Sequence, residues 1–489
     1  MTGELQPGAE EWLVTATIDD VLQALDRQEI TSVWLVEQYL RRIAKYNHQG
    51  PEINAVLEVN PEALLQAEAL DWERQEGKSR GHLHGIPILL KDNIDTGDKL
   101  HTSAGSIALA NSHAAEDAFL VRRLREAGAI VLGKANMTEW ANFMTYDMPN
   151  GYSSRGGQVL NPYGPGVLDV GGSSSGSAAG VAAGFAAAAV GTETSGSILS
   201  PASANSLVGV KPTLGLVSRT GIIPIAYSQD TAGPIAPSVK AAAYMLQAMA
   251  GPDAADVATW RLQHRQPTDY AAALVGATLA GARIGVPRKK FLEGVSDGQL
   301  AVFERGIEEL RKLGAAVVQL DMGFAAYDEE DINVLLYEFK SAINAYLNKL
   351  PADVPVHSLA DVISFNMRHA EKALRYDQTL LVEAQHTTGT LTEARYIESR
   401  LNDVRSSRSE GIDAALQAHG LDALLFVNNY GAGIAAKAGY PSVTVPAGYT
   451  DDGEPVGLTF TGTAFSEAQL LSLAYAYEQG THHRVQPKL

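Results

Sequence analysis

Apolar residues in the first part of the chain recur at helical spacing. The run after Thr17 has this spacing, and the Thr17 hydroxyl can cap the start of a helix. The same pattern predicts a second helix over residues 32–46 and a third over residues 61–75. The N-terminal segment, about residues 1–80, is therefore predicted to be helical.

Short apolar runs bounded by glycine follow this segment and indicate buried strands. Ile86-Pro-Ile-Leu-Leu90 is one such run, and Lys91 stands at its end. A predicted helix over residues 117–127 leads through Gly128 into another apolar run, and the same order recurs over residues 300–318 and 412–427. Helix, glycine and apolar strand in this order predict an α/β protein with much parallel sheet.

The chain shows no internal repeat and no long linker, so we expect one large domain over residues 1–489. Its catalytic core is expected at about 81–240, and the substrate side and C-terminal part at about 241–489. Within these parts, the alanine-rich run 178–190 is predicted to be a buried helix, and the polar residues 251–300 a surface excursion.

Charge and composition exclude several classes of function. The 489 residues carry 38 basic and 56 acidic side chains, a net charge of −18, which disfavours nucleic acid and anionic membranes as partners. The chain has no cysteine, so disulfides, cysteine nucleophiles and thiolate metal sites are ruled out. No signal peptide or membrane span is visible, and a cytoplasmic location is expected.

Metal and phosphate motifs are missing, and the histidines fit surface or loop positions. His82 and His84 flank one leucine, and no H-E-x-x-H pattern occurs. One short motif, Gly172-Ser-Ser-Ser-Gly176, matches the G-x-S-x-G nucleophile elbow with Ser174 at its centre. That motif arises easily in glycine- and serine-rich sequence, and no acid and histidine stand downstream in a telling context.

The remaining candidate chemistry is a lysine followed by two serine-rich loops. Lys91 comes after three aliphatic residues, and burial would lower its pKa far enough for it to act as a base toward a serine hydroxyl. Taken alone, the position of Lys91 is explained better by a buried lysine that pairs with Asp92. The loop Gly191-Thr-Glu-Thr-Ser-Gly-Ser197 can form either an oxyanion hole or an ordinary tight turn.

At these residues the sequence resembles the amidase signature family over nearly its whole length. The family patterns G-G-S-S-G-G-S-A and G-T-D-x-G-G-S-I resemble two blocks of this chain, and two further blocks resemble the segments around the family's lysine. The four blocks are Gly171-Gly-Ser-Ser-Ser-Gly-Ser-Ala178, Gly191-Thr-Glu-Thr-Ser-Gly-Ser-Ile198, Gly85-Ile-Pro-Ile-Leu-Leu-Lys-Asp-Asn93 and Gly133-Lys-Ala-Asn-Met-Thr-Glu-Trp140. The resemblance implies a single α/β/α domain with a mixed sheet covered by helices.

The resemblance also implies roles for individual residues. Ser197 matches the nucleophile, Ser173 the bridging serine after a cis peptide bond at Gly172–Ser173, and Lys91 the base. Thr192 would lie beside this triad and support it with its hydroxyl. The backbone N–H groups that would form the oxyanion hole are those of Thr194, Ser195, Gly196 and Ser197. An acyl-enzyme on Ser197 is implied, with no metal or other cofactor.

Two departures from the family pattern bear on the substrate. Leu199 stands where many members have arginine, and Ser195 replaces a glycine. The form G-T-E-T-x-G-S-I with a following aliphatic residue is similar to bacterial peptide amidases, which implies a small-molecule or peptide amide as substrate. Asn428, Asn429 and Tyr430 are candidate substrate-binding residues, and the protein is expected to be a monomer or homo-oligomer.

Three other functions remain open at this point. The same triad could hydrolyse a carbamate (urethane) or an ester, because these share the tetrahedral oxyanion. The chain could instead be an amidotransferase A-type subunit that works with partner proteins, although Leu199 argues against that role. A catalytically inactive receptor is disfavoured, because all three triad positions are filled.

Overall fold

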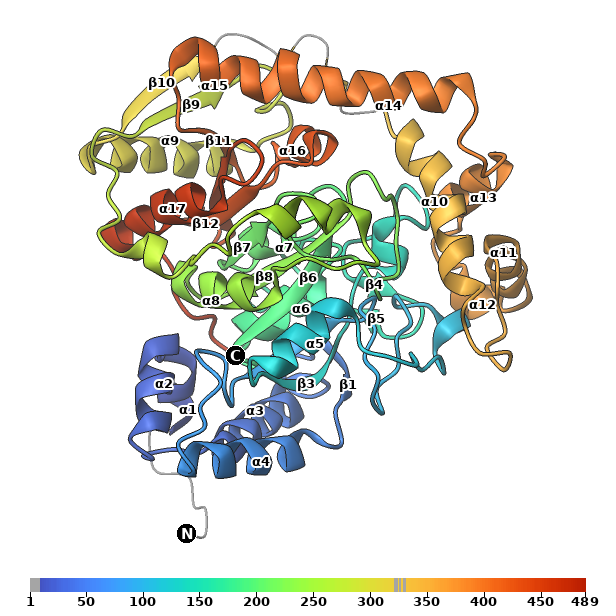
Figure 1. The fold of residues 1–489 in the computed structure, drawn as a ribbon, viewed down its shortest axis with the longest axis horizontal. Coiled ribbons are helices and arrows are strands. Elements are labelled where there is room, and N and C mark those ends of the chain that lie inside the picture. The colour runs from blue at the N-terminus through green and yellow to red at the C-terminus, as the bar shows by residue number, and fades with distance from the viewer. Residues whose placement is uncertain (1–8, 321–323, 325–326, 329–330) are drawn as a thin grey trace.

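The computed structural model describes residues 9–320, 324, 327, 328 and 331–489, which surround one large β-sheet (Figure 1). The strands of this sheet are β1 (Val56–Val59), β2 (Pro87–Lys91), β3 (Ile130–Ala135), β6 (Ala188–Glu193), β7 (Val208–Lys211), β8 (Thr231–Ala236), β9 (Arg283–Pro287), β10 (Ala316–Leu320), β11 (Ala423–Val427), β12 (Ser442–Tyr449) and β13 (Pro455–Thr461). A separate hairpin pairs β4 (Tyr152–Ser153) with β5 (Gly157–Gln158).

The 11 strands lie in the order β1-β3-β2-β6-β8-β7-β12-β13-β11-β9-β10. The strands β3, β2 and β6 are parallel to one another, as are β11, β9 and β10 near the opposite edge. The strands between these two groups pair in antiparallel fashion. The prediction of a single α/β domain with a mixed sheet is confirmed, and a helix lies in the chain between the parallel strands β2 and β3 and another between β9 and β10.

Helices cover the sheet on both faces and extend beyond one side of it (Figure 1). The α-helices are α1 (Ala9–Thr15), α2 (Ile18–Asp26), α3 (Ser32–Tyr46), α4 (Ala63–Gln75), α5 (Phe119–Glu126), α6 (Ser175–Ala182), α7 (Leu199–Ala204), α8 (Val239–Met249), α9 (Asp297–Lys312), α10 (Asn333–Leu347), α11 (Leu359–Arg368), α12 (Ala370–Ala373), α13 (Thr379–His386), α14 (Ala394–Ser407), α15 (Asp413–His419), α16 (Ala432–Ala438) and α17 (Glu467–Thr481). The 3₁₀-helical segments are η1 (Ile107–Leu109), η2 (Glu139–Asn142), η3 (Val257–His264) and η4 (Ala272–Leu274), and η5 (Arg408–Ile412) is a π-helical turn.

The predicted N-terminal helices are present, and local capping explains where the first of them begins. Asp20 N–H donates to the Thr17 hydroxyl at 3.2 Å, and Thr17 N–H donates to the Asp20 carboxylate at 2.9 Å. This reciprocal pair satisfies two N–H groups that the first turn of α2 would leave free. In Figure 1, α1 to α4 gather at one end of the molecule, near strands β1 and β3.

The sequence predicted a buried helix over the alanine-rich run 178–190, and this prediction is wrong. Helix α6 ends at Ala182, Gly184 adopts a left-handed φ of +69°, and residues 188–190 belong to strand β6. Such a run has neither helical nor strand periodicity, so the glycine and the pairing of β6 with β2 and β8 decide its structure.

The prediction of a surface excursion over residues 251–300 is also only partly correct. Strand β9 lies inside this range, and it pairs with both β10 and β11 within the main sheet. Its first residue, Arg283, is exposed, which shortens the apolar run that a buried strand normally shows. The remaining described residues of the range form short turns and the start of α9.

Candidate active site

Lys91 is the last residue of β2, and its amino group is buried among polar partners. Its Nζ lies 2.8 Å from Ser173 Oγ, 2.9 Å from Thr192 Oγ1 and 3.1 Å from the Thr192 carbonyl oxygen. The parallel pairing of β2 with β6 brings these residues together, because Thr192 follows the paired residue Val190 by two positions. The lysine therefore faces one serine and one threonine hydroxyl.

The environment of Lys91 favours the neutral amine. Burial lowers the pKa of Lys91 to about 7, and the negative charges of Glu193 and Asp230 oppose this shift without cancelling it. A neutral lysine has a lone pair that can accept the proton of the Ser173 hydroxyl. A large fraction of the protein therefore carries a basic Lys91 at neutral pH.

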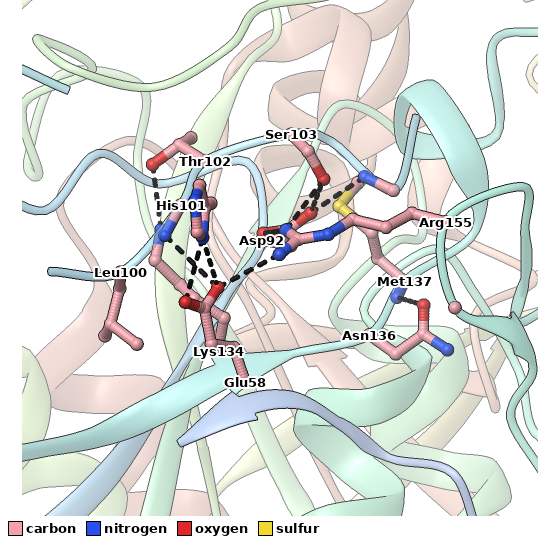
Figure 2. A network of polar contacts seen from close by, with 12 residues as sticks. Glu58, Asp92, Leu100, His101, Thr102, Ser103, Lys134, Asn136, Met137 and Arg155 are labelled. Atoms are coloured by element: carbon pink, nitrogen blue, oxygen red, sulfur yellow. Dashed lines mark hydrogen bonds and ion pairs between the residues drawn. The ribbon is translucent and has the colours of Figure 1, made fainter. Parts of the chain in front are cut away.

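The alternative ion pair between Lys91 and Asp92 does not form. Asp92 is fully buried and belongs to a separate polar network (Figure 2), in which its Oδ1 lies 3.2 Å from an Arg155 nitrogen. The hydroxyl of Ser103 and the backbone N–H of Gly105 also donate to the Asp92 carboxylate. The charge of Asp92 is compensated on the side away from Lys91, and this network anchors the end of β2.

Glu58 and His101 extend the network toward β1. A second Arg155 nitrogen lies 3.0 Å from the Glu58 carboxylate, and His101 Nδ1 lies 2.9 Å from the same group (Figure 2). The arginine thus joins one carboxylate on β1 to another at the end of β2. Because the Asp92 carboxylate is completely buried, its negative charge requires the positive charge of Arg155 beside it.

We expect an Arg155→Met variant to be less stable than the wild type by about 3 kcal/mol, because it would leave the buried Asp92 carboxylate without its cation. Urea denaturation of both proteins measures this difference. Arg155→Lys, which keeps the charge, should recover part of the loss. An Arg155→Met protein as stable as the wild type would show that the ion pair does not hold the end of β2.

Ser173 is fully buried and precedes the first turn of α6. The peptide bond between Gly172 and Ser173 is cis, as the family resemblance implies. The Ser173 carbonyl oxygen accepts a hydrogen bond from Thr138 N–H at 3.1 Å, which holds the carbonyl group of Ser173 in place. The helix can pack this deeply because Gly176 has no side chain; a Cβ there would lie 2.3 Å from the Asn136 carbonyl oxygen.

Ser174, the centre of the elbow motif, has a different arrangement. Its hydroxyl donates to the Thr192 carbonyl oxygen at 3.1 Å and accepts from Thr192 N–H at 3.2 Å. Its side chain is fully buried, so both hydrogen-bonding functions serve to attach α6 to β6. This arrangement does not support an elbow nucleophile at Ser174.

The loop after β6 brings Ser197 close to the cis peptide. The Ser197 carbonyl oxygen accepts a hydrogen bond from Ser174 N–H at 3.1 Å. The main chain of Ser197 therefore contacts the residue that directly follows Ser173. Glu193 fixes the end of the loop, since its carboxylate accepts from Ile198 N–H at 2.7 Å and Leu199 N–H at 3.0 Å. The sequence does not predict this role of Glu193.

Inside this loop, backbone donors remain available. Among the described residues, none accepts a hydrogen bond from the N–H groups of Thr194, Ser195, Gly196 or Ser197. Gly196 has a φ of +85°, a conformation that L-residues rarely adopt, and it turns the chain within this set of donors. Free N–H groups on consecutive residues are the arrangement that an anionic oxygen requires.

The candidate substrate-binding residues 428–430 follow β11 and lie in different environments. Asn429 is adjacent to the loop, because a Cβ on Gly196 would lie 3.1 Å from Asn429 Nδ2. Asn428 instead accepts from Gly457 N–H at 2.8 Å with its side-chain oxygen, and the Tyr430 hydroxyl donates to the Gly294 carbonyl oxygen at 3.1 Å. Of the three, Asn429 is the residue that stays beside the predicted site.

A cavity of about 300 Å³ opens beside Thr192 and Thr194. Residues that the sequence analysis did not single out line much of its wall, including Asn93, Arg219, Tyr227 and Asp230, together with apolar residues of the segment 222–225 and helix α10. Asn93 has a sequence signal, since it follows the Lys-Asp pair of the family block, and Arg219 and Asp230 stand in the stretches 209–219 and 228–234, which also resemble the family. The others come from loops whose positions depend on the complete fold.

Asp230 connects this cavity to the loop after β6. Its carboxylate accepts from the Thr194 hydroxyl at 2.6 Å and from the backbone N–H groups of Ile225 and Ala226 at 2.8 and 2.9 Å. Burial raises the pKa of Asp230 to about 6. The side chain of Thr194 is therefore engaged by Asp230, while its N–H stays available.

Neither a metal-ion site nor a membrane-spanning helix is found among the described residues. No group of three or more histidine, aspartate and glutamate side chains there could hold a metal ion. None of the helices in the described part of the chain is both long enough and apolar enough to cross a membrane.

Comparison with known proteins agrees with this geometry. The family model for amidases matches residues 34–471. The crystal structure of native peptide amidase from Stenotrophomonas maltophilia is 47% identical, covers 97% of this chain and 98% of its own, and superposes with a TM-score of 0.92.

Two curated relatives are also similar over almost the whole chain. A probable amidase of Arabidopsis thaliana is 41% identical over 97% of this chain and 91% of its own length. The A-type subunit of the glutamyl-tRNA(Gln) amidotransferase from Methylobacillus flagellatus is 34% identical over 96% of this chain and 98% of its own.

The fold and the matched family define the class of the protein, an α/β hydrolytic enzyme of the amidase type. The chain belongs to the amidase signature family, and its activity is the hydrolysis of amide bonds. The amidotransferase alternative corresponds to a more distant relationship and is less well supported.

Proposed function

We propose that this enzyme removes the C-terminal amide group of peptides through an acyl-enzyme on Ser197. The observation that carries the mechanism is the position of Lys91, with a pKa lowered to about 7 and its Nζ 2.8 Å from Ser173 Oγ. Neutral Lys91 accepts the proton of Ser173 while Ser173 accepts the proton of Ser197. The Ser197 oxygen then attacks the amide carbon.

The free N–H groups of residues 194–197 bind the negative oxygen of the tetrahedral intermediate. Ser173 returns the proton to the amide nitrogen, the C–N bond breaks, and ammonia leaves. Water enters the vacated position, Ser173 and Lys91 remove its proton, and the carboxylic acid is released. Thr192 supports the relay, because it holds the lysine with both its hydroxyl and its carbonyl oxygen.

Local charges support a neutral group at the reacting end of the substrate. Leu199 is buried at the position where many relatives have arginine. On the cavity wall, Arg219 is paired with Asp256, to which it donates three hydrogen bonds. Lys349 also lines the cavity but is exposed and follows the end of α10. Among the described residues of the cavity wall, Arg219 is already paired with Asp256 and Lys349 is exposed to solvent, so a substrate carboxylate would gain little from either cation, which favours an uncharged amide end.

We expect the primary amide of an N-protected dipeptide to be hydrolysed with release of ammonia, while the internal peptide bond of the same dipeptide acid stays intact. The comparison should include an aryl carbamate of matched size, with ammonia or the aryl amine measured. A kcat/KM for the carbamate that exceeded that for the primary amide by orders of magnitude would identify a urethane hydrolase instead.

A further inference from the structure

Asn93 lies two residues after Lys91, and its amide orientation is fixed by its neighbours. Its Nδ2 donates to Thr192 Oγ1 at 3.0 Å and approaches the Ile223 carbonyl oxygen at 3.4 Å. A backbone carbonyl can only accept hydrogen bonds, so the nitrogen of the amide, and not its oxygen, faces Ile223. The side-chain oxygen of Asn93 therefore points away from both partners.

That oxygen is enclosed and unpaired. Asn93 is 2% exposed, and no described residue donates a hydrogen bond to its Oδ1. A buried carbonyl without a donor is unfavourable, so proteins seldom keep one unless a ligand or water supplies the donor. Asn93 also lines the cavity beside Thr192 and Thr194, where the substrate of the proposed reaction would enter.

We propose that Asn93 Oδ1 accepts a hydrogen bond from an N–H of the amide nitrogen that leaves, and that Asn93 thereby selects amides over esters. The inference rests on the proposed function, because it assumes that the C–N bond breaks beside Lys91 and Ser173. The Asn93 nitrogen donates to Thr192 Oγ1, which also accepts from Lys91 Nζ, so the side chains of Asn93 and Thr192 together connect the leaving group to the base.

The chemistry explains why the effect depends on the leaving group. As Ser197 attacks, the amide nitrogen becomes pyramidal and accepts the relayed proton from Ser173, and its other N–H bonds remain available to Asn93. When the C–N bond breaks, the bonding electron pair leaves with ammonia. An ester oxygen in the same position has no hydrogen to donate, so it gains nothing from Asn93.

The test compares a primary amide with the methyl ester of the same N-protected amino acid. For Asn93→Leu, kcat/KM for the amide should fall about 10-fold to 100-fold further than for the ester, the usual cost of a lost hydrogen bond at a buried acceptor. Thr194→Val is the matched control. It removes a hydroxyl on the same cavity wall, where Thr194 donates to Asp230, and leaves both contacts of Asn93 intact, so amide and ester rates should change together.

Two further measurements separate selection from general damage. In the wild type, the ratio of kcat/KM for the amide to kcat/KM for the ester should decrease from the primary amide to the N-methyl amide, which has one N–H, and decrease further for the dimethyl amide, which has none. Asn93→Asp keeps an acceptor oxygen and should retain the preference for amides, while its charge moves the acidic limb of the pH profile upward by favouring protonated Lys91.

An equal decrease of kcat/KM for the amide and the ester in Asn93→Leu would overturn the inference. It would assign Asn93 to folding or to a step that both substrates share. Labelling of Ser197 by a fluorophosphonate in the same preparation shows whether the site is intact. If the wild type labelled elsewhere or cleaved no amide, the proposed function itself would fail, which is a distinct result.

Discussion

Replacing Ser197 by alanine is expected to lower amide turnover by at least about 10⁴-fold, the scale seen when a serine enzyme loses its nucleophile. The proposed mechanism gives the Ser197 hydroxyl the bond-forming step, and water alone reacts slowly with an amide. Its carbonyl oxygen, which binds Ser174 N–H, is unchanged by the substitution. Ammonia release measures activity, and thermal unfolding should show a stability close to that of the wild type.

Ser174→Ala is the matched control for this experiment. The Ser174 hydroxyl bonds to the Thr192 backbone in both directions, so its loss should destabilise the protein by about 1 kcal/mol without removing the nucleophile. A fluorophosphonate should label this variant on Ser197, as it should the wild type. Labelling of the wild type on Ser174, or substantial activity in Ser197→Ala, would refute the assignment.

The parts of the fold that the sequence predicted are those with strong local signals. Helix α3 occupies residues 32–46, the range that the apolar spacing predicts, and Thr17 caps α2 because its partner Asp20 is only three residues away. The order of the strands could not be predicted, because β6 and β8 pair through contacts between distant residues. Strand β9 was missed for the same reason, since its pairing with β10 and β11 outweighs its polar surroundings.

The candidate site divides in a similar way. Lys91, Ser173 and Ser197 stand in sequence blocks that resemble a known family, so their proximity could be inferred from the resemblance. The partner of Asp92 could not, because Arg155 is 63 residues away and reaches the carboxylate only after β2 and the hairpin of β4 and β5 are in place. The unpaired oxygen of Asn93 is a property of three-dimensional packing and has no sequence pattern.

Replacing Lys91 by methionine is expected to lower kcat/KM by about 10²-fold to 10⁴-fold, the usual contribution of a general base. In the wild type, activity should rise as the pH increases through about 7, because only the neutral amine accepts a proton and burial lowers the pKa of Lys91 to that value. The acidic limb should be absent from the residual activity of Lys91→Met. An unchanged limb in this variant would show that another group titrates.

The same substitution is expected to make the protein more stable, because burial disfavours the charged form of Lys91. Its pKa is about 7 in the folded protein and 10.5 in its unperturbed state, so unfolding takes up a proton between these values. The stability of the wild type should therefore rise with pH across this window, relative to Lys91→Met, and the advantage of the methionine variant should be largest below about pH 7.

Urea denaturation of both proteins from pH 6 to pH 10 measures this difference directly. A difference that does not change with pH would mean that Lys91 has an ordinary pKa in the folded protein, and the proposed base would then be protonated at neutral pH. Loss of activity together with a gain in stability is the combination expected of a residue held in an unfavourable state for catalysis.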